Sequence, residues 1–311
     1  MTQPLRFDGR TAVVTGAGGN PSLGRAYALL LAERGANVVV NDIGALPAAL
    51  GYAGVASAEA VAEEIRSCGG KAVADTHSVA TDEGAAAIIQ TALDAFGSID
   101  ILVNNAGICR VVSFEEMTAH DFRDTIEVNL MGTVATCRAA WPHMKAQGYG
   151  RIVNISSGSM AGFAWQSAYA ASKAGVFSFT RALAVEGAPH GIKANNLTPG
   201  ALTRMVYASQ EESSPLIQLG KEQLSPESVA PAMAFLAHES CPFTGESIES
   251  IGGHVRRMYL ARTPGFIDPD MTIETLAERW GDVMAGADEG IFQNIDMDPR
   301  EWHIKPYVPV E

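Results

Sequence analysis

The chain has 311 residues, of which 47% are hydrophobic and 18% are charged, so it can bury a sizeable core and does not have a disordered composition. Its 35 acidic and 22 basic side chains give a formal net charge of −13 at pH 7, which argues against nucleic acid as a partner. The four cysteines are widely spaced and the seven histidines form no HExxH pair, so we expect neither a disulfide framework nor a bound metal.

Targeting and membrane segments are not expected. The first ten residues lack a basic stretch followed by an apolar one, and no run approaches 18 uninterrupted apolar residues. Free cysteines suit a reducing compartment. The sequence therefore predicts a soluble, cytoplasmic protein with no membrane partner.

The predicted elements alternate between strands and helices along the chain. Short apolar runs have the length of strands at residues 11–15, 38–41, 72–74, 101–104, 151–155 and 192–197. Helical spacing of apolar residues occurs between them, at residues 23–34, 83–96 and around 121–145, and Gly35 and Gly97 stand where helices commonly end. This alternation predicts an α/β fold with a doubly wound parallel sheet covered by helices on both faces.

Three segments interrupt this alternation. Residues 43–57 form a connection rich in Ala and Gly, longer than a usual loop between strand and helix. The polar segment 201–225 is expected to be a substrate lid, or alternatively a helix and loop that only cover the sheet edge. From about Pro264 the chain is rich in proline and aromatic residues, which favours packing on its own subunit or at an oligomer interface over disorder.

The first strand leads into a turn that is rich in glycine and then into a helix. Gly16, Gly18, Gly19 and Gly24 would let backbone N–H groups approach a pyrophosphate at the helix N-terminus, although glycines also simply permit tight turns. Asp42 follows the second strand, where a carboxylate accepts ribose hydroxyls and repels a 2′-phosphate. This arrangement favours NAD over NADP, unless Asp42 only caps a loop.

Tyr169 and Lys173 are four residues apart in the motif YAASK, downstream of Ser156 and Ser157. On a helix this spacing places phenol and ammonium on one face, where the cation lowers the phenol pKa and makes Tyr169 a usable acid or base. The pair alone is a common surface pattern. It gains weight because NNAG at 104–107 and Pro199–Gly200 accompany it in order.

With these four motifs, the chain resembles the short-chain dehydrogenase/reductase family from Phe7 to about Gly253. The resemblance implies a Rossmann-type, seven-stranded parallel sheet in the order 3-2-1-4-5-6-7, a single domain over residues 1–265, and a C-terminal extension over 266–311 that is a packed tail or oligomer contact. It implies that Tyr169 is the catalytic acid or base, that Lys173 binds the nicotinamide ribose, and that Asn129 sustains a proton-relay water. Further NAD contacts implied by the family pattern are Gly16, Leu23, Asp42, Asn105, Gly107, Pro199 and Thr203.

Three positions depart from the family pattern. The glycine turn contains the extra residues Asn20, Pro21 and Ser22, and Ser22 is expected to supply a hydroxyl to the cofactor. His77 stands where an Asp usually meets the adenine, so Ser78 and Val79 are expected to offer backbone groups instead. Spacing from Tyr169 selects Ser156 as the substrate serine, but counting along the strand selects Ser157, which we prefer because a loop tolerates a deletion better than a buried strand.

Within the family, segments such as LAERGANVVVND and RRMYLARTPG resemble the 3-hydroxyacyl-CoA dehydrogenase units of peroxisomal multifunctional enzymes type 2, also called 17β-hydroxysteroid dehydrogenases type 4. A 3-hydroxyacyl-CoA substrate is therefore expected. Five arginines could meet its phosphates if they are not simply solvated: Arg110, Arg204, Arg256, Arg257 and Arg262. Two alternatives are a dehydrogenase of free cyclic or steroid alcohols and a nucleotide-sensing module without catalysis. The family implies a homo-oligomer, either a dimer or a tetramer.

Overall fold

The computed structural model describes residues 4–44, 57–209, 213, 215–285 and 291–292. The chain divides into two compact units, Met1–Arg257 and Met258–Glu311. The expected long connection at 43–57 falls almost entirely outside the described residues.

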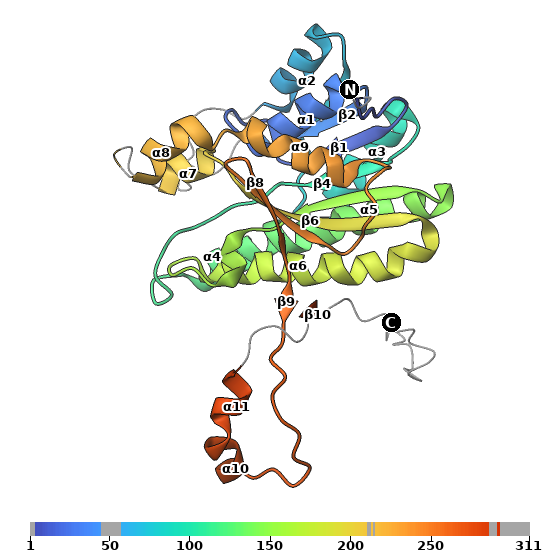
Figure 1. The fold of residues 1–311 in the computed structure, drawn as a ribbon. Coiled ribbons are helices and arrows are strands. Elements are labelled where there is room, and N and C mark those ends of the chain that lie inside the picture. The colour runs from blue at the N-terminus through green and yellow to red at the C-terminus, as the bar shows by residue number, and fades with distance from the viewer. Residues whose placement is uncertain (1–3, 45–56, 210–212, 214, 286–290, 293–311) are drawn as a thin grey trace. The chain divides into compact units, whose positions relative to one another are not determined.

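The first unit is built on an eight-stranded sheet in the order β3-β2-β1-β4-β5-β6-β7-β8 (Figure 1). The strands are β1 (Thr11–Val14), β2 (Asn37–Asn41), β3 (Lys71–Asp75), β4 (Ile101–Asn104), β5 (Gly150–Ile155), β6 (Ile192–Gly200), β7 (Ser247–Ile251) and β8 (His254–Met258). Strands β1 to β7 pair in parallel. The predicted Rossmann-type sheet and its order are confirmed.

An eighth strand, which the sequence did not predict, extends the sheet beyond β7. Only Gly252 and Gly253 separate β7 from β8, and both have positive φ angles, 54° and 81°. A two-residue connection can join only antiparallel strands, so β8 runs against the rest of the sheet. The polar, exposed sequence of β8 has neither a strand-like apolar run nor a buried face.

Helices cover both faces of the sheet, because successive residues of each buried strand point to opposite sides. Val14 of β1 and Val40 of β2 share one core with α1 (Leu23–Glu33), α2 (Ala58–Ser67) and α9 (Pro226–Ala237). Val13 and Val39 share the other with α3 (Asp82–Phe96), α5 (Gly132–Gln147) and α6 (Ser167–Gly187) (Figure 1). Both faces of the strands are apolar for this reason.

The helical stretch expected around residues 121–145 consists of three parts. Helix α4 (Ala119–Ile126) continues into a π-helical turn, Glu127–Met131, and then into α5. π-Helical turns inside α-helices are rare and occur frequently at functional sites. This one contains Asn129, whose side chain is fully buried.

Strand β6 is longer than predicted, because Pro199 and Gly200 are its last two residues rather than a turn after it. They pair with β7 at Ser250 and Ile251. The pairing with β5 ends earlier, at Leu197. Pro199 therefore stands where β6 has a neighbour on one side only, which is where a strand tolerates a residue without an N–H group.

The second unit contains two short helices, α10 (Ile273–Glu278) and α11 (Trp280–Met284), and an antiparallel pair, β9 (Leu260–Ala261) with β10 (Ile291–Phe292). Thr272 caps α10, and the Arg279 guanidinium lies 3.9 Å from the centre of the Phe266 ring. The aromatic residues Trp302 and Tyr307, which belong to the tail expected to pack, lie outside the described residues.

Candidate active site

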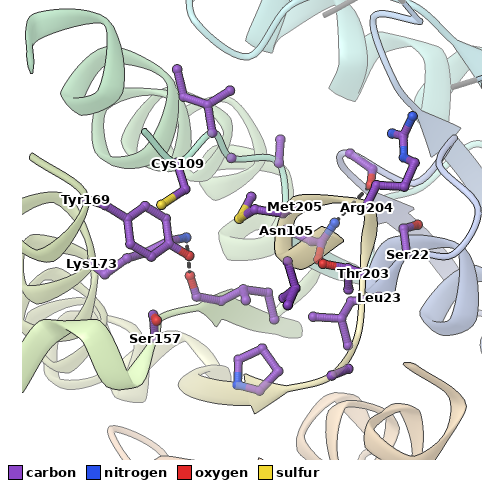
Figure 2. Close-up of a pocket in the computed structure, with 18 of the residues that line it drawn as sticks. Ser22, Leu23, Asn105, Cys109, Ser157, Tyr169, Lys173, Thr203, Arg204 and Met205 are labelled. Atoms are coloured by element: carbon purple, nitrogen blue, oxygen red, sulfur yellow. Dashed lines mark hydrogen bonds between the residues drawn. The ribbon is translucent and has the colours of Figure 1, made fainter. Parts of the chain in front are cut away.

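A pocket of about 420 Å³ opens at the carboxyl ends of the parallel strands. Ligands of open α/β sheets bind at this edge. Thirteen of the predicted site residues line the pocket: Gly16, Ser22, Leu23, Asp42, Ser78, Val79, Asn105, Gly107, Ser157, Tyr169, Lys173, Pro199 and Thr203. Asn129 does not line it. Figure 2 shows Tyr169, Lys173 and Ser157 on one side of the pocket, facing Ser22 and Arg204 on the other.

The glycine turn after β1 is held by hydrogen bonds from neighbouring loops. Gly16 has a φ of 64°, a conformation that favours glycine. The Asn105 side chain donates to the carbonyl oxygens of Thr15 (2.9 Å) and Gly16 (3.0 Å). Both amide protons of Asn105 are thus engaged with the turn, which indicates that this residue shapes the site from behind.

The Ser22 hydroxyl both accepts and donates a hydrogen bond within the protein. Its Oγ accepts from Arg25 N (3.2 Å) as the N-cap of α1 and donates to Gly19 O (2.9 Å). An N-cap serine satisfies one of the free N–H groups at a helix start. The inserted residues therefore close the turn onto α1, and the Ser22 hydroxyl contributes mainly to that closure.

Asp42 is buried at the end of β2, and both of its carboxylate oxygens accept a backbone N–H group. Oδ2 accepts from Gly18 (2.9 Å) and Oδ1 from Gly44 (3.0 Å). An ionised carboxylate has about four acceptor positions, so it retains room for ribose hydroxyls. Asp42 thus caps its loop and also lines the pocket.

The end of β3 holds a buried carboxylate, Asp75, beneath His77. Asp75 accepts hydrogen bonds from the His77 ring (2.9 Å), Thr91 Oγ1 (2.7 Å) and Asn41 Nδ2 (2.7 Å). Burial raises the pKa of the Asp75 carboxyl, but the bonds from His77, Thr91 and Asn41 together outweigh it and lower the pKa. His77 is thereby engaged with β3, and Ser78 and Val79 follow it into the pocket lining.

Tyr169 and Lys173 lie one helical turn apart at the start of α6. The Lys173 Nζ is 5.6 Å from the centre of the Tyr169 ring and donates to Ile155 O at 2.7 Å. The Lys173 side chain is buried, and this desolvation lowers its pKa to about 8. A cationic group is therefore held at the phenol with a fixed position.

The two adjacent serines after β5 differ in their partners. Ser156 is buried, and its Oγ donates to Lys173 O at 3.0 Å. Ser157 is partly exposed; its Oγ donates to Ser159 Oγ at 3.2 Å and accepts from Ser159 N at 3.1 Å. Both hydroxyl protons have a partner, but Ser156 is buried and bonded to the main chain of α6, whereas Ser157 is partly exposed and donates to the neighbouring Ser159 hydroxyl, so this geometry favours Ser157.

Asn129 lies behind the pocket wall. Its Oδ1 accepts from Ile108 N (2.8 Å), and its Nδ2 donates to Ile108 O (2.9 Å) and to Ser172 Oγ (3.1 Å). All its amide hydrogens are engaged, so its side chain positions the loop after β4. Its π-helical turn could not be read from the sequence, because no residue type marks such a turn.

Cys109 and Arg204 line the pocket although neither was predicted as a catalytic or cofactor-binding residue. Cys109 lies close to Tyr169 (Figure 2), and burial raises the pKa of its thiol to about 11. Arg204 begins helix α7 (Arg204–Ser209) and was considered only as a contact for CoA. Neither position has a local sequence pattern, since NNAG and PG mark the preceding turns and not these side chains.

The arginines expected to gather for CoA are largely engaged elsewhere. Arg110 pairs with Asp121 and Asp124, Arg256 with Glu249, and Arg257 with Glu246. Among the described residues that line the pocket, Lys173 and Arg204 are the basic ones. Arg262 belongs to the second unit. A basic cluster is therefore not seen at this pocket.

Within the described ranges, no helix is long and apolar enough to cross a membrane. The same residues contain no group of three or more His, Cys, Asp or Glu side chains that could hold a metal ion.

The doubly wound sheet, the glycine turn and the Tyr169–Lys173 pair at its carboxyl edge define a Rossmann-type oxidoreductase. A family model described as short chain dehydrogenase matches residues 10–214. The chain belongs to this family, as its motifs indicated. It is therefore an enzyme that acts on CH–OH groups, which argues against the sensing module, and its family typically binds NAD or NADP.

Known proteins resemble most of the chain. It is 44% identical over 285 residues to peroxisomal multifunctional enzyme type 2 of Mus musculus, covering 90% of this chain and 37% of that protein. It is 44% identical over 276 residues to a short-chain type dehydrogenase/reductase of Mycobacterium tuberculosis, covering 88% and 93%. The solved full-length peroxisomal multifunctional enzyme type 2 of Drosophila melanogaster matches with a TM-score of 0.73 and 38% identity, covering 90% of this chain and 46% of that one. The chain thus spans less than half the length of these two multifunctional enzymes.

Proposed function

We propose that the protein is an NAD-dependent dehydrogenase that interconverts a secondary alcohol and a ketone. The observation that carries this proposal is the meeting of Tyr169, Lys173 and Ser157 in one pocket with the glycine turn and Asp42. Side chains for proton transfer and a cradle for a dinucleotide thus share one cavity. The residues present fit such a cofactor, because a side chain at Gly19 would fill the turn and Arg204 Nε is a buried polar atom without a partner.

The chain's own residues supply the proton chemistry. Tyr169 would remove the hydroxyl proton of the alcohol, and the buried Lys173 ammonium would stabilise the phenolate that performs this step. Ser157 would hold the substrate oxygen as the carbonyl develops. A dinucleotide held in this pocket would supply the acceptor for the hydride that leaves the carbinol carbon.

Preference for NAD rests on Asp42. Its buried carboxylate follows β2 in the pocket lining, and a 2′-phosphate of NADP bound beside it would meet a negative charge. NAD presents hydroxyls there, which can donate to the same oxygens.

A 3-hydroxyacyl-CoA substrate is supported by the resemblance to multifunctional enzymes type 2 and by apolar side chains near the pocket. Val111 lines the pocket, and Val112 N donates to Trp165 O at 2.9 Å, which joins two loops carrying exposed Phe163 (56%) and Trp165 (65%). An apolar acyl chain or steroid side chain would cover such surface.

A free cyclic or steroid alcohol is the second candidate, and the ion pairs of Arg110, Arg256 and Arg257 favour it because they leave few cations for CoA. The deciding experiment compares NAD-linked kcat/KM for a 3-hydroxyacyl-CoA, its free acid and a panel of cyclic and steroid alcohols. A higher value for the thioester supports the first candidate. A substantial preference for the free compound would refute it, and no turnover of any secondary alcohol would refute both.

We also propose a homo-oligomer, either a dimer or a tetramer, built on the long helices α5 and α6. Sedimentation equilibrium would give its mass directly. The cytoplasmic location stays a prediction, and the matching multifunctional enzymes are named as peroxisomal.

A further inference from the structure

Arg204 reaches from the segment after β6 to the glycine turn after β1. An ideal Cβ placed on Gly19 would lie 2.6 Å from Arg204 Nη2 and 2.8 Å from Nε, so the guanidinium packs directly against the Gly19 backbone. Figure 2 shows Arg204 and Ser22 on the side of the pocket opposite Tyr169. A side chain at position 19 would displace the guanidinium from this position.

Among the described residues, no carboxylate neutralises the Arg204 guanidinium. No ion pair to Arg204 is found among the described residues, and its buried Nε lacks a hydrogen-bond partner. Arg25, on the next helix, is paired with Glu64. A buried donor without a partner costs free energy unless a ligand satisfies it. Lys173, the other basic side chain of the pocket, already donates to Ile155 O.

The position of this cation matches a diphosphate. It lies at the N-terminus of α1, an 11-residue helix whose dipole favours an anion there. On the neighbouring Gly18, the built Cβ would meet Asp42 Cβ at 2.8 Å. Arg204 thus packs against Gly19, and Asp42 packs against the adjacent Gly18. A cation and an anion at neighbouring positions of the turn suit the phosphate and ribose portions of a dinucleotide.

We propose that Arg204 binds the pyrophosphate of the dinucleotide and so couples cofactor binding to the substrate side of the pocket. This proposal rests on the proposed function. Met205 and Val206 follow Arg204 and also line the pocket. Arg204 N donates to Pro21 O at 3.3 Å, a second link between the segment and the turn. Cofactor binding would thus hold residues 203–206 in place before the alcohol enters, which predicts ordered binding with the dinucleotide first.

Calorimetric titration of the full chain with NADH, ADP-ribose, adenosine and free CoA tests this assignment. Replacing Arg204 by Met should weaken the binding of NADH and ADP-ribose about ten- to a hundredfold, the range for a charge-assisted hydrogen bond. Adenosine, which lacks phosphate, should bind unchanged. Arg204→Lys keeps the charge without the planar fork and should fall between.

The matched control is Arg123→Met, which removes the same charge from an exposed position on α4 outside the pocket. It should bind all ligands as the wild type does. Equal affinity of wild type and R204M for ADP-ribose would overturn the proposal, and so would a loss confined to CoA. Wild-type protein that binds ADP-ribose but not NADH would contradict the proposed function, while the ADP-ribose comparison would still decide the role of Arg204.

Discussion

The two sides of the pocket are built from different parts of the chain. Around the glycine turn, the side chains of Asn105, Ser22 and Asp42 are bonded to the backbone, and the surface offered to a ligand is largely main chain. Around Tyr169, the backbone of α6 and β5 is regular, and side chains supply the chemistry. One side therefore depends on shape and the other on residue identity, and substitutions should separate the two.

The largest effect is expected from Tyr169→Phe, which keeps the ring and removes the hydroxyl that transfers the proton. Turnover should fall at least a thousandfold, near the upper range for a general acid–base group. NADH affinity, measured by fluorescence titration, should stay within twofold. Full activity in this variant would contradict the assignment of Tyr169.

The two serines give a matched pair on the catalytic side. Ser157→Ala should lower kcat about a hundredfold, because it removes a donor to the developing oxyanion. Ser156→Ala removes a hydroxyl bonded to Lys173 O and should cost less than tenfold. Steady-state kinetics of both variants test the choice, and the reverse ranking would assign the role to Ser156.

On the other side, Asp42→Ser should shift cofactor preference without abolishing catalysis. The ratio of kcat/KM for NAD to that for NADP is expected to fall about 10- to 100-fold, since the variant no longer repels a 2′-phosphate. Part of the decrease in kcat/KM for NAD would come from losing the hydrogen bond that Gly18 N donates to the Asp42 carboxylate. An unchanged ratio would show that Asp42 only caps its loop.

The smallest effect concerns stability and follows from the buried Lys173. Its folded pKa of about 8 lies below its ordinary value of 10.5, so the unfolded chain binds this proton more tightly. Burying the charged lysine therefore lowers the free energy of unfolding. This destabilisation is fully present below pH 8 and is relieved as the pH rises from 8 to 10.5. Lys173→Met, inactive as an enzyme, should therefore be about 2 kcal/mol more stable at pH 7, allowing for the lost bond to Ile155.

Urea denaturation of both proteins at pH 7 and at pH 10 measures this difference. The stabilisation should shrink at the higher pH, because the wild-type lysine is then largely neutral in the folded state. A variant that is less stable than wild type at pH 7 would show that Lys173 carries little desolvation cost.

Sequence patterns predicted the sheet well and the site unevenly. Apolar runs such as 101–104 are sufficient for buried parallel strands, because both faces must be covered. The exposed strand β8 has no such pattern. Within the site, YxxxK is a local spacing that a helix converts directly into a shared face. The contact between Gly19 and Arg204 spans 185 positions in the chain and depends on how two loops meet, which periodicity cannot predict.

Partners of individual side chains were also beyond prediction. Asn129, Asn105 and Ser22 were expected to serve the ligand, yet their polar atoms are bonded to Ile108, the glycine turn and α1. A sequence shows that a polar residue is near a motif. It does not show which neighbouring carbonyl or amide competes for it.

The π-helical turn at Glu127–Met131 has a consequence for the helices on either side. A π turn adds one residue to a helix. The segment before the turn is therefore rotated by about 100° about the helix axis relative to the segment after it. Helix α4 contacts α6, whereas α5 contacts α3 and the sheet. The added residue thus lets one continuous helical rod present two differently oriented contact faces. Deleting a single residue in this turn would make α4, the turn and α5 one regular α-helix. Helix α4 would then be misaligned against α6, and Asn129 would be withdrawn from Ile108.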